Sequence, residues 1–290
     1  MTYNQVAAAI DETSHSKQVA ARAKQLAQQN DADVCLVHVI EDRYYPSSSE
    51  LYGYDIIQEY EKKHQQNIRK SLNELASDLA IEHDNIAILN GRIAQEIKTY
   101  SENYNIDLLV LGAHKKDGIG SYFGSNANSI LHHANTDILM TRTQNDSEGS
   151  IVAPYKKILL AIDFIPEIEP VIKQAQTLAQ ANNATIEMVY VVDGPLGFDI
   201  PSDSYKKQLI EKAQWQFKQL KSVYDLGDTK SQVLVGNVSS KISHYADKHD
   251  CDVILTGSHG RHGIGLLLGS VTNSLFHKAD CDVLAVNITR

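Results

Sequence analysis

The 290-residue sequence predicts an α/β protein made of two tandem doubly wound domains, each with a five-stranded parallel sheet. Two observations lead to this prediction. Short apolar runs alternate with amphipathic segments of helical period along the whole chain. The pattern also occurs twice, because Ala9-Ile10-Asp11 recurs as Ala161-Ile162-Asp163. The length agrees, since a domain commonly has about 100–200 residues.

The elements are clearest in the second copy, and the first copy follows the same order. The strands are apolar runs of the kind found in buried parallel strands, and the helices carry apolar residues at every third or fourth position. We expect strands over 158–162, 185–192, 232–235, 252–256 and 282–287, and helices around 171–179, 209–224, 239–248 and from 269 onward. This alternation predicts a parallel sheet covered on both faces, with right-handed crossovers.

A polar stretch over 144–150 separates the two copies and is suited to a linker. We place the boundary near residue 148, giving domains over 1–148 and 149–290. The last strand of each domain would be an exposed edge, which proteins usually cover.

The composition disfavours several classes of partner. The 27 Lys and Arg against 36 Asp and Glu give a net charge of −9, whereas nucleic acids and anionic membranes attract basic surfaces. No apolar run has the roughly 18 residues of a membrane span, and no signal peptide is evident at the N-terminus. Three cysteines without CxxC spacing indicate reduced thiols. We expect a cytoplasmic protein that binds neither nucleic acid nor membrane.

The most informative segment for function is 257–270, where a strand leads through a glycine-rich loop into a helix. Glycines allow close backbone approach to a ligand, and free N–H groups at a helix start attract anions. If strand order reverses between the first and fourth strands, Asp163 faces this loop across a ligand crevice. The alternatives are a tight turn for the loop and a helix cap for Asp163.

These residues resemble those of the universal stress protein family, over nearly the whole chain and twice. ATP-binding members carry Gly-x2-Gly-x9-Gly-Ser/Thr after the fourth strand, an Asp ending the first strand and a Val in the second. The resemblance implies a nucleotide site in the second copy at Asp163, Val191, Gly257, Gly260, Arg261, Gly269, Ser270 and Val271. Its weaker counterparts in the first copy are Asp11, Val39, Gly112, Gly124 and Ser125.

Two departures from the family motif distinguish the copies. Only eight residues separate Gly260 from Gly269, where the ATP-binding pattern has nine. In the first copy, Lys115 replaces the second glycine. We therefore expect an asymmetric pair, with a competent or weak site in the C-terminal copy and a degenerate one in the N-terminal copy.

The resemblance implies a bacterial stress-response protein whose two domains pack like the family's homodimer, as an intramolecular pseudo-dimer in which the last strands, 137–142 and 282–287, pair. We hypothesise that it binds ATP or AMP, with or without Mg²⁺, and regulates through protein contacts. We assign no catalytic and no metal residues. One alternative is a nucleotide-free scaffold that meets an unidentified protein partner through the Tyr-rich insert over 42–55. A third is a slow ATPase or zinc-dependent activity built on His259, His262 and Asp163. The chain could be a monomer with a pseudo-dimeric core or a homodimer.

Overall fold

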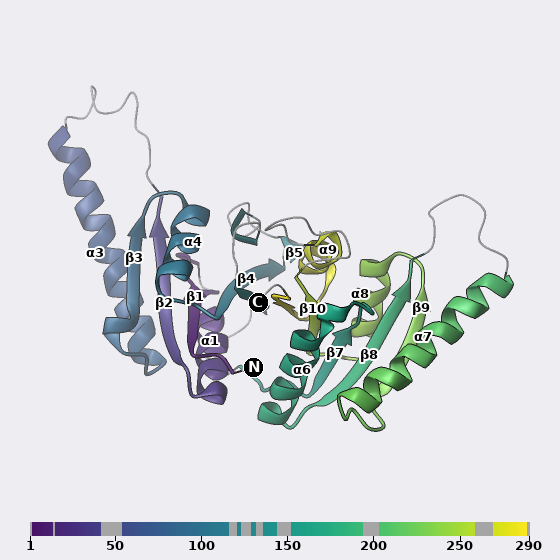
Figure 1. The fold of residues 1–290 in the computed structure, drawn as a ribbon. Helices are drawn as coiled ribbons and strands as arrows, with labels where there is room; N and C mark the ends of the chain where they lie inside the picture. The colour runs from purple at the N-terminus through teal and green to yellow at the C-terminus, as the bar shows by residue number, and fades with distance from the viewer. Residues whose placement is uncertain are drawn as a thin grey trace.

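The structure is a computed structural model that describes residues 2–13, 15–41, 54–115, 121–122, 129–131, 136–143, 152–193, 203–258 and 269–288. Two halves of similar build lie side by side (Figure 1). The N-terminal half contains β1 (Gln5–Ala9), α1 (Ser16–Asn30), β2 (Asp33–Ile40), α3 (Tyr54–Asp78), the 3-10 turn η1 (His83–Asn85), β3 (Ile86–Asn90), α4 (Ile93–Asn103), β4 (Leu108–Lys115), β5 (Ser121–Tyr122) and β6 (Asp137–Thr143).

The C-terminal half repeats this order and agrees with the predicted elements. It contains β7 (Lys157–Ala161), the 3-10 turn η2 (Pro166–Ile168), α6 (Glu169–Asn182), β8 (Thr185–Val192), α7 (Asp203–Val223), β9 (Lys230–Val235), α8 (Val238–Lys248), β10 (Val253–Gly257), α9 (Ser270–Lys278) and β11 (Asp282–Val286). Bounds differ from prediction by a few residues at most strands and by more at helix ends, where fraying makes any assignment less definite.

The predicted doubly wound topology is confirmed. The strand order is β3-β2-β1-β4-β6-β11-β10-β7-β8-β9, and all pairs within each half of this path are parallel. In each half the order reverses between the first and fourth strands, between β1 and β4 and between β7 and β10. The sequence did not predict β5, a short strand antiparallel to the end of β4.

Two apolar layers sandwich the sheet, one on each face. On one face α1, α3, α6 and α7 pack against alternate strand residues such as Ala8 and Leu160. On the other face, α4, α8 and α9 pack against the intervening strand residues, such as Ala7 and Leu159. This alternation follows from the period of two along a strand. Both layers run through the two halves without interruption. Within the described part of the chain, no helix combines the length and apolar character needed to cross a membrane.

The two halves form a single sheet because their last strands pair, as predicted. β6 and β11 run antiparallel, with Leu139 opposite Leu284 and Met140 opposite Val283. All four of these side chains are buried. The strands that would end each half are therefore covered by each other, and the predicted intramolecular pseudo-dimer is confirmed.

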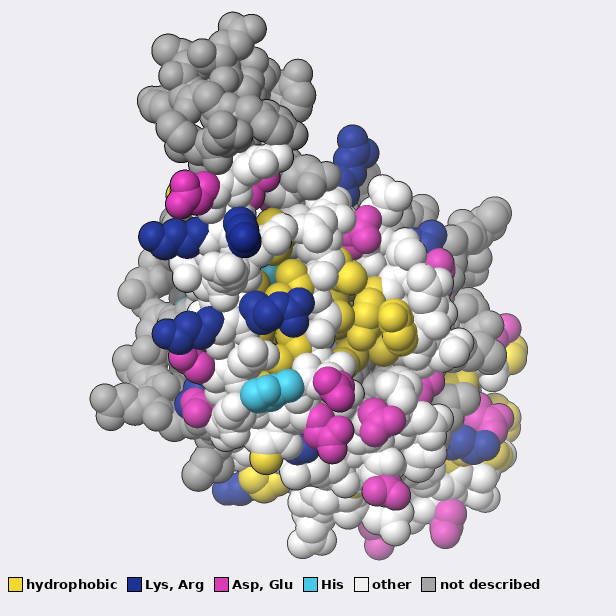
Figure 2. Space-filling model, turned by 90° about the vertical axis from the view of Figure 1, so that its left-hand side faces the viewer, with side chains coloured by type: hydrophobic (Ala, Val, Ile, Leu, Met, Phe, Trp, Pro, Cys, Tyr) yellow, Lys and Arg dark blue, Asp and Glu magenta, His cyan; other side chains and the backbone are white. Residues whose placement is uncertain are grey.

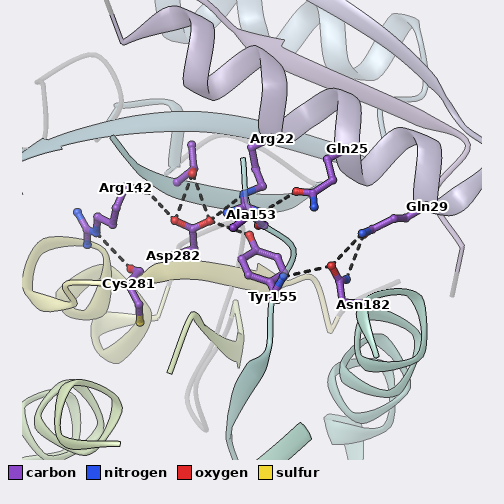
Figure 3. Close-up of polar contacts among 10 residues, drawn as sticks. Arg22, Gln25, Gln29, Arg142, Ala153, Tyr155, Asn182, Cys281 and Asp282 are labelled. Carbon is purple, nitrogen blue, oxygen red and sulfur yellow. Dashed lines mark hydrogen bonds and ion pairs between the residues drawn. The ribbon is translucent and has the colours of Figure 1, made fainter. Parts of the chain in front are cut away.

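A buried carboxylate, Asp282, organises the polar contacts at this junction (Figure 3). It accepts hydrogen bonds from the Tyr155 hydroxyl at 2.7 Å and from the Arg142 backbone N–H at 2.8 Å. Arg22 Nε lies 3.2 Å from Asp282 Oδ2, and the two groups form an ion pair. The direction of the Nε–H group does not fit a hydrogen bond. The Arg22 guanidinium also lies 4.2 Å from the Tyr155 ring centroid. Arg22 and Asp282 are nearly inaccessible to solvent. Each neutralises the charge of the other, because a single charge buried here without a partner would be costly.

These contacts break the symmetry of the repeat. Gln174 occupies the position equivalent to Arg22, and Asn287 the position equivalent to Arg142. Arg142 donates through Nη2 to the Phe276 carbonyl at 2.7 Å, near the end of α9 in the other half. Burial lowers the pKa of the Arg142 guanidinium, and the nearby Asp282 opposes this shift. Both interface arginines thus come from the N-terminal half and contact acceptors of the C-terminal half.

We predict that Asp282→Ala lowers the free energy of unfolding by about 3–5 kcal/mol, because it leaves Arg22 buried without its counter-charge. Urea denaturation followed by circular dichroism measures the change. Lys17→Ala is the control: it breaks an exposed ion pair of 2.7 Å with Asp78, and such pairs contribute less than about 1 kcal/mol. Equal losses in the two variants would contradict the importance of the buried pair.

A second prediction concerns alkaline pH. Burial, followed by the charge of Asp282, raises the pKa of Tyr155 well above its usual value of 10.0. Above pH 10 the unfolded chain releases this proton while the folded protein keeps it, so stability falls as pH rises. Tyr155→Phe removes the ionisable hydroxyl and with it this contribution to the pH dependence of stability. We expect the unfolding free energy of the variant to decline less steeply than that of the parent protein in urea titrations above pH 10; parallel profiles would contradict the assignment.

Candidate functional site

The candidate site lies at the carboxyl ends of β7 and β10, where the strand order of the C-terminal half reverses. Asp163 comes two residues after β7, and Gly257 is the last residue of β10. The two strands are hydrogen-bonded neighbours, so both residues lie at the same edge of the sheet. In open α/β sheets this is the place where ligands bind. The predicted site residues Asp163 and Gly257 are therefore brought together at one edge.

Three hydrogen bonds anchor the ends of the glycine-rich segment, one to β11 and two between the ends themselves. Ser258 N–H donates to the Val286 carbonyl at 2.8 Å, and Gly269 N–H donates to the Ser258 carbonyl at 2.6 Å. The Thr272 hydroxyl donates to the Gly257 carbonyl at 2.8 Å. The start of α9 is thus fixed against the end of β10, whereas 259–268 lie outside the described residues.

The N-terminus of α9 has few local partners among the described residues. Gly269 is its N-cap, no described side chain caps the first turn, and that turn contains no acidic residue. Backbone N–H groups at a helix start carry partial positive charge and commonly bind phosphate or carboxylate groups. The predicted site residues Ser270 and Val271 form this first turn, with Ser270 exposed. Gly257 lies close to the chain end, because a Cβ there would be 3.2 Å from Ile288 Cγ2.

The two aspartates at the ends of the first strands have different surroundings. In the N-terminal half, Asp11 Oδ1 accepts from Thr13 N–H at 3.0 Å, the Thr13 hydroxyl at 2.6 Å and the Ser16 hydroxyl at 2.8 Å. Asp11 is thus held by hydrogen bonds from the turn and the first residue of α1 that follow it. In the C-terminal half, Ile165 and Ile168 occupy the positions of these hydroxyl residues. Asp163 therefore has neither of these two local hydroxyl donors.

The first copy builds its glycine motif differently. β4 continues through Gly112 to Lys115, pairing with β6 as far as His114 opposite Thr143. Its last two residues then pair with β5, Lys115 opposite Ser121. β10, by contrast, ends at its glycine. In the N-terminal half the chain thus stays in an extended hairpin where the C-terminal half leaves its strand.

The remaining predicted residues divide into two groups. Val39 and Val191 are buried in β2 and β8 and pack in the same layer as α4 and α8. Gly260, Arg261, Gly124 and Ser125 lie outside the described residues, as do His259, His262 and most of the Tyr-rich insert. Among the residues that the structure describes, no group of three or more His, Cys, Asp or Glu is placed to hold a metal ion.

The doubly wound arrangement, present twice in one chain and joined into a single sheet, defines a tandem two-domain protein of the α/β class. The sequence model of the universal stress protein family matches residues 2–142 and 154–287. The chain therefore belongs to the universal stress protein family, as a tandem member.

Individual relatives agree with this membership. Universal stress protein A homolog 1 of Coxiella burnetii is 38% identical over 138 residues, which cover 46% of this chain and 96% of the relative. A universal stress protein from Archaeoglobus fulgidus covers 99% of this chain and 100% of its own, with 13% identity and a TM-score of 0.71, which supports the shared fold. Some members of the family bind nucleotides: one universal stress protein, 22% identical and covering 47% of this chain with a TM-score of 0.35, was crystallised in complex with cAMP.

Sequence reasoning missed Thr272, whose hydroxyl ties α9 to β10. The only signal in the sequence is a difference between the copies, since Ala127 occupies the equivalent position in the first. The Thr272 side chain is buried, so its hydroxyl and the Gly257 carbonyl depend on each other for hydrogen bonding.

We predict that Thr272→Val lowers the free energy of unfolding by about 1–2 kcal/mol, because the Gly257 carbonyl loses its partner. Hydrogen exchange of the Ser258 and Gly269 amides should accelerate as the loop ends separate. Thr177→Val is a matched control, since that exposed hydroxyl bonds only to the Lys173 carbonyl within α6. Unchanged exchange at Ser258 and Gly269 would show that Thr272 does not hold the loop.

Proposed function

We propose that the C-terminal half binds an adenine nucleotide, ATP or AMP, and that the chain acts as a stress-response regulator through protein contacts. The observation that carries this proposal is the first turn of α9, which no described side chain caps and which Thr272 and Gly269 fix against the end of β10, the strand that pairs with β7 just before Asp163. A partially positive helix start beside a carboxylate suits a ligand with a phosphate at one end and hydroxyl groups at the other.

Each residue then has a defined task. The α9 amides and the Ser270 hydroxyl bind phosphate oxygens, with Gly257, Gly260 and Arg261 completing the phosphate side. Asp163 accepts hydrogen bonds from ribose hydroxyls, and Val191 with Val271 contributes apolar surface. Mg²⁺, where present, would neutralise phosphate charge. We assign no catalytic residue, so bound nucleotide serves as a signal or a store rather than a substrate turned over rapidly.

The N-terminal half is proposed to bind nucleotide weakly or not at all. Asp11 already accepts three hydrogen bonds from Thr13 and Ser16. The backbone after Gly112 is committed to the β4–β5 hairpin, which leaves less freedom to surround a phosphate. One nucleotide per chain is therefore expected, with the site in the C-terminal half.

We predict that Gly269→Val lowers nucleotide affinity by at least about 10-fold, the effect of losing charge-assisted hydrogen bonds to phosphate. Gly269 has φ −59°, which any residue can adopt. The substitution therefore obstructs the α9 amides without straining the backbone. Isothermal titration with ATP and AMP measures the change, and circular dichroism checks the fold.

Gly124→Val, at the equivalent position of the first copy, is the matched control and should leave affinity unchanged. Equal loss in both variants would place nucleotide in both halves. No binding by the parent protein at millimolar nucleotide would instead favour the scaffold alternative, in which the eight-residue spacing closes the site.

A further inference from the structure

The outermost strand of the N-terminal half presents an open sheet edge. β3 and β9 stand at the two ends of the strand order, and among the described residues β3 pairs only with β2. An open edge carries unpaired N–H and C=O groups that another strand can bind. We refer to Ile86–Asn90 and the groove beside it as the β3 edge.

The two open edges differ in their protection. β9 begins with Lys230, followed by Ser231 and Gln232, and an edge lysine is a common means of preventing strand addition. β3 has the sequence Ile-Ala-Ile-Leu-Asn, without a charge or a proline. The β3 edge thus lacks the feature that protects its counterpart.

Apolar and polar side chains both lie around the β3 edge. The groove beside the strand is lined by Ile86, Ala87, Ile88, Leu89, Tyr100 and Tyr104, and also by Arg69, Asp84, Glu96, Thr99 and Asn103. Tyr104 is 60% exposed and stacks on Tyr100 with ring centroids 4.4 Å apart. Figure 2 shows apolar side chains gathered near the centre of this face, surrounded by side chains of both charges.

The direction of the free backbone groups follows from one hydrogen bond. Gly91 N–H donates to the Ile40 carbonyl of β2 at 3.0 Å, so Gly91 faces β2. Backbone groups alternate sides along a strand. The N–H and C=O groups of Ile86, Ile88 and Asn90 therefore point away from β2, toward the open side.

We propose that the β3 edge binds the β3 edge of a second copy of this chain, antiparallel and about a twofold axis at Ile88. In this register Ile88 faces Ile88 of the second copy, and Ile86 faces Asn90. Three outward residues on each strand then exchange about six backbone hydrogen bonds. The contact is closed, because the same surface is used on both copies.

Charge complementarity supports this occupant and this register. Asp84 lies four residues before Ile88 and Arg92 lies four residues after it, and both are exposed. The twofold axis therefore places each Asp84 opposite Arg92 of the second copy.

The test is a charge swap in the full chain, measured by light scattering coupled to size exclusion. We expect the parent protein to have twice the 32.2 kDa mass of one chain. Asp84→Arg alone and Arg92→Asp alone place like charges together and should weaken the dimer at least ~100-fold. The double variant D84R/R92D, and an equimolar mixture of the two single variants, should restore it.

Lys218→Glu with Lys221→Glu, beside the β9 edge, is the matched control and should not change the mass. All substituted residues are on the surface, and circular dichroism confirms that each variant is folded. A monomeric parent protein, or a dimer indifferent to both single variants, would overturn the proposal. Failure of the double variant to recover would overturn the Ile88 register. None of these outcomes depends on nucleotide binding.

Discussion

The pairing of β6 with β11 is the interaction on which the rest of the structure depends. Each half alone would end in a strand whose two faces are apolar, and such an edge invites association with any other strand. Joining them makes one sheet and two continuous apolar layers, so the core of each half extends into the other. Asp282, Arg22 and Tyr155 then satisfy the polar groups at the junction, which burial would otherwise make costly.

Duplication gave two similar crevices, and divergence has given them different surroundings. Thr13 and Ser16 engage Asp11, whereas isoleucines occupy those positions near Asp163. Thr272 fixes the start of α9, whereas Ala127 occupies that position in the first copy. An alanine cannot make the contact that Thr272 makes, and isoleucines cannot donate to Asp163 as Thr13 and Ser16 donate to Asp11. Such changes require no alteration of the fold, since function resides in loops at the strand ends.

The fold was predictable because its signals repeat: buried strands as apolar runs, helices as amphipathic segments, and both twice. The pairing of the last strands was implied by the resemblance to the universal stress protein family and agrees with the need to cover an edge. The contacts at that junction could not be predicted, because Arg22, Tyr155 and Asp282 are distant in sequence and meet only in three dimensions. The β4–β5 hairpin was missed for a related reason. Gly112 and Gly257 look alike in sequence, and only the pairing of Lys115 with Ser121 shows that the chain after Gly112 continues as a strand.

A sheet made by joining two domains still has two edge strands. Each edge strand must either be protected against pairing with strands of other molecules or bind a partner through such pairing. Repeat symmetry would treat both edges alike, yet β9 carries Ser231 and Gln232 at the positions of Ile86 and Ala87 in β3. Burial does not explain this difference, because both strands are only partly covered. The two proposed roles would divide protein contact and ligand binding between the halves. A tandem chain allows such a division, because its two copies can diverge separately.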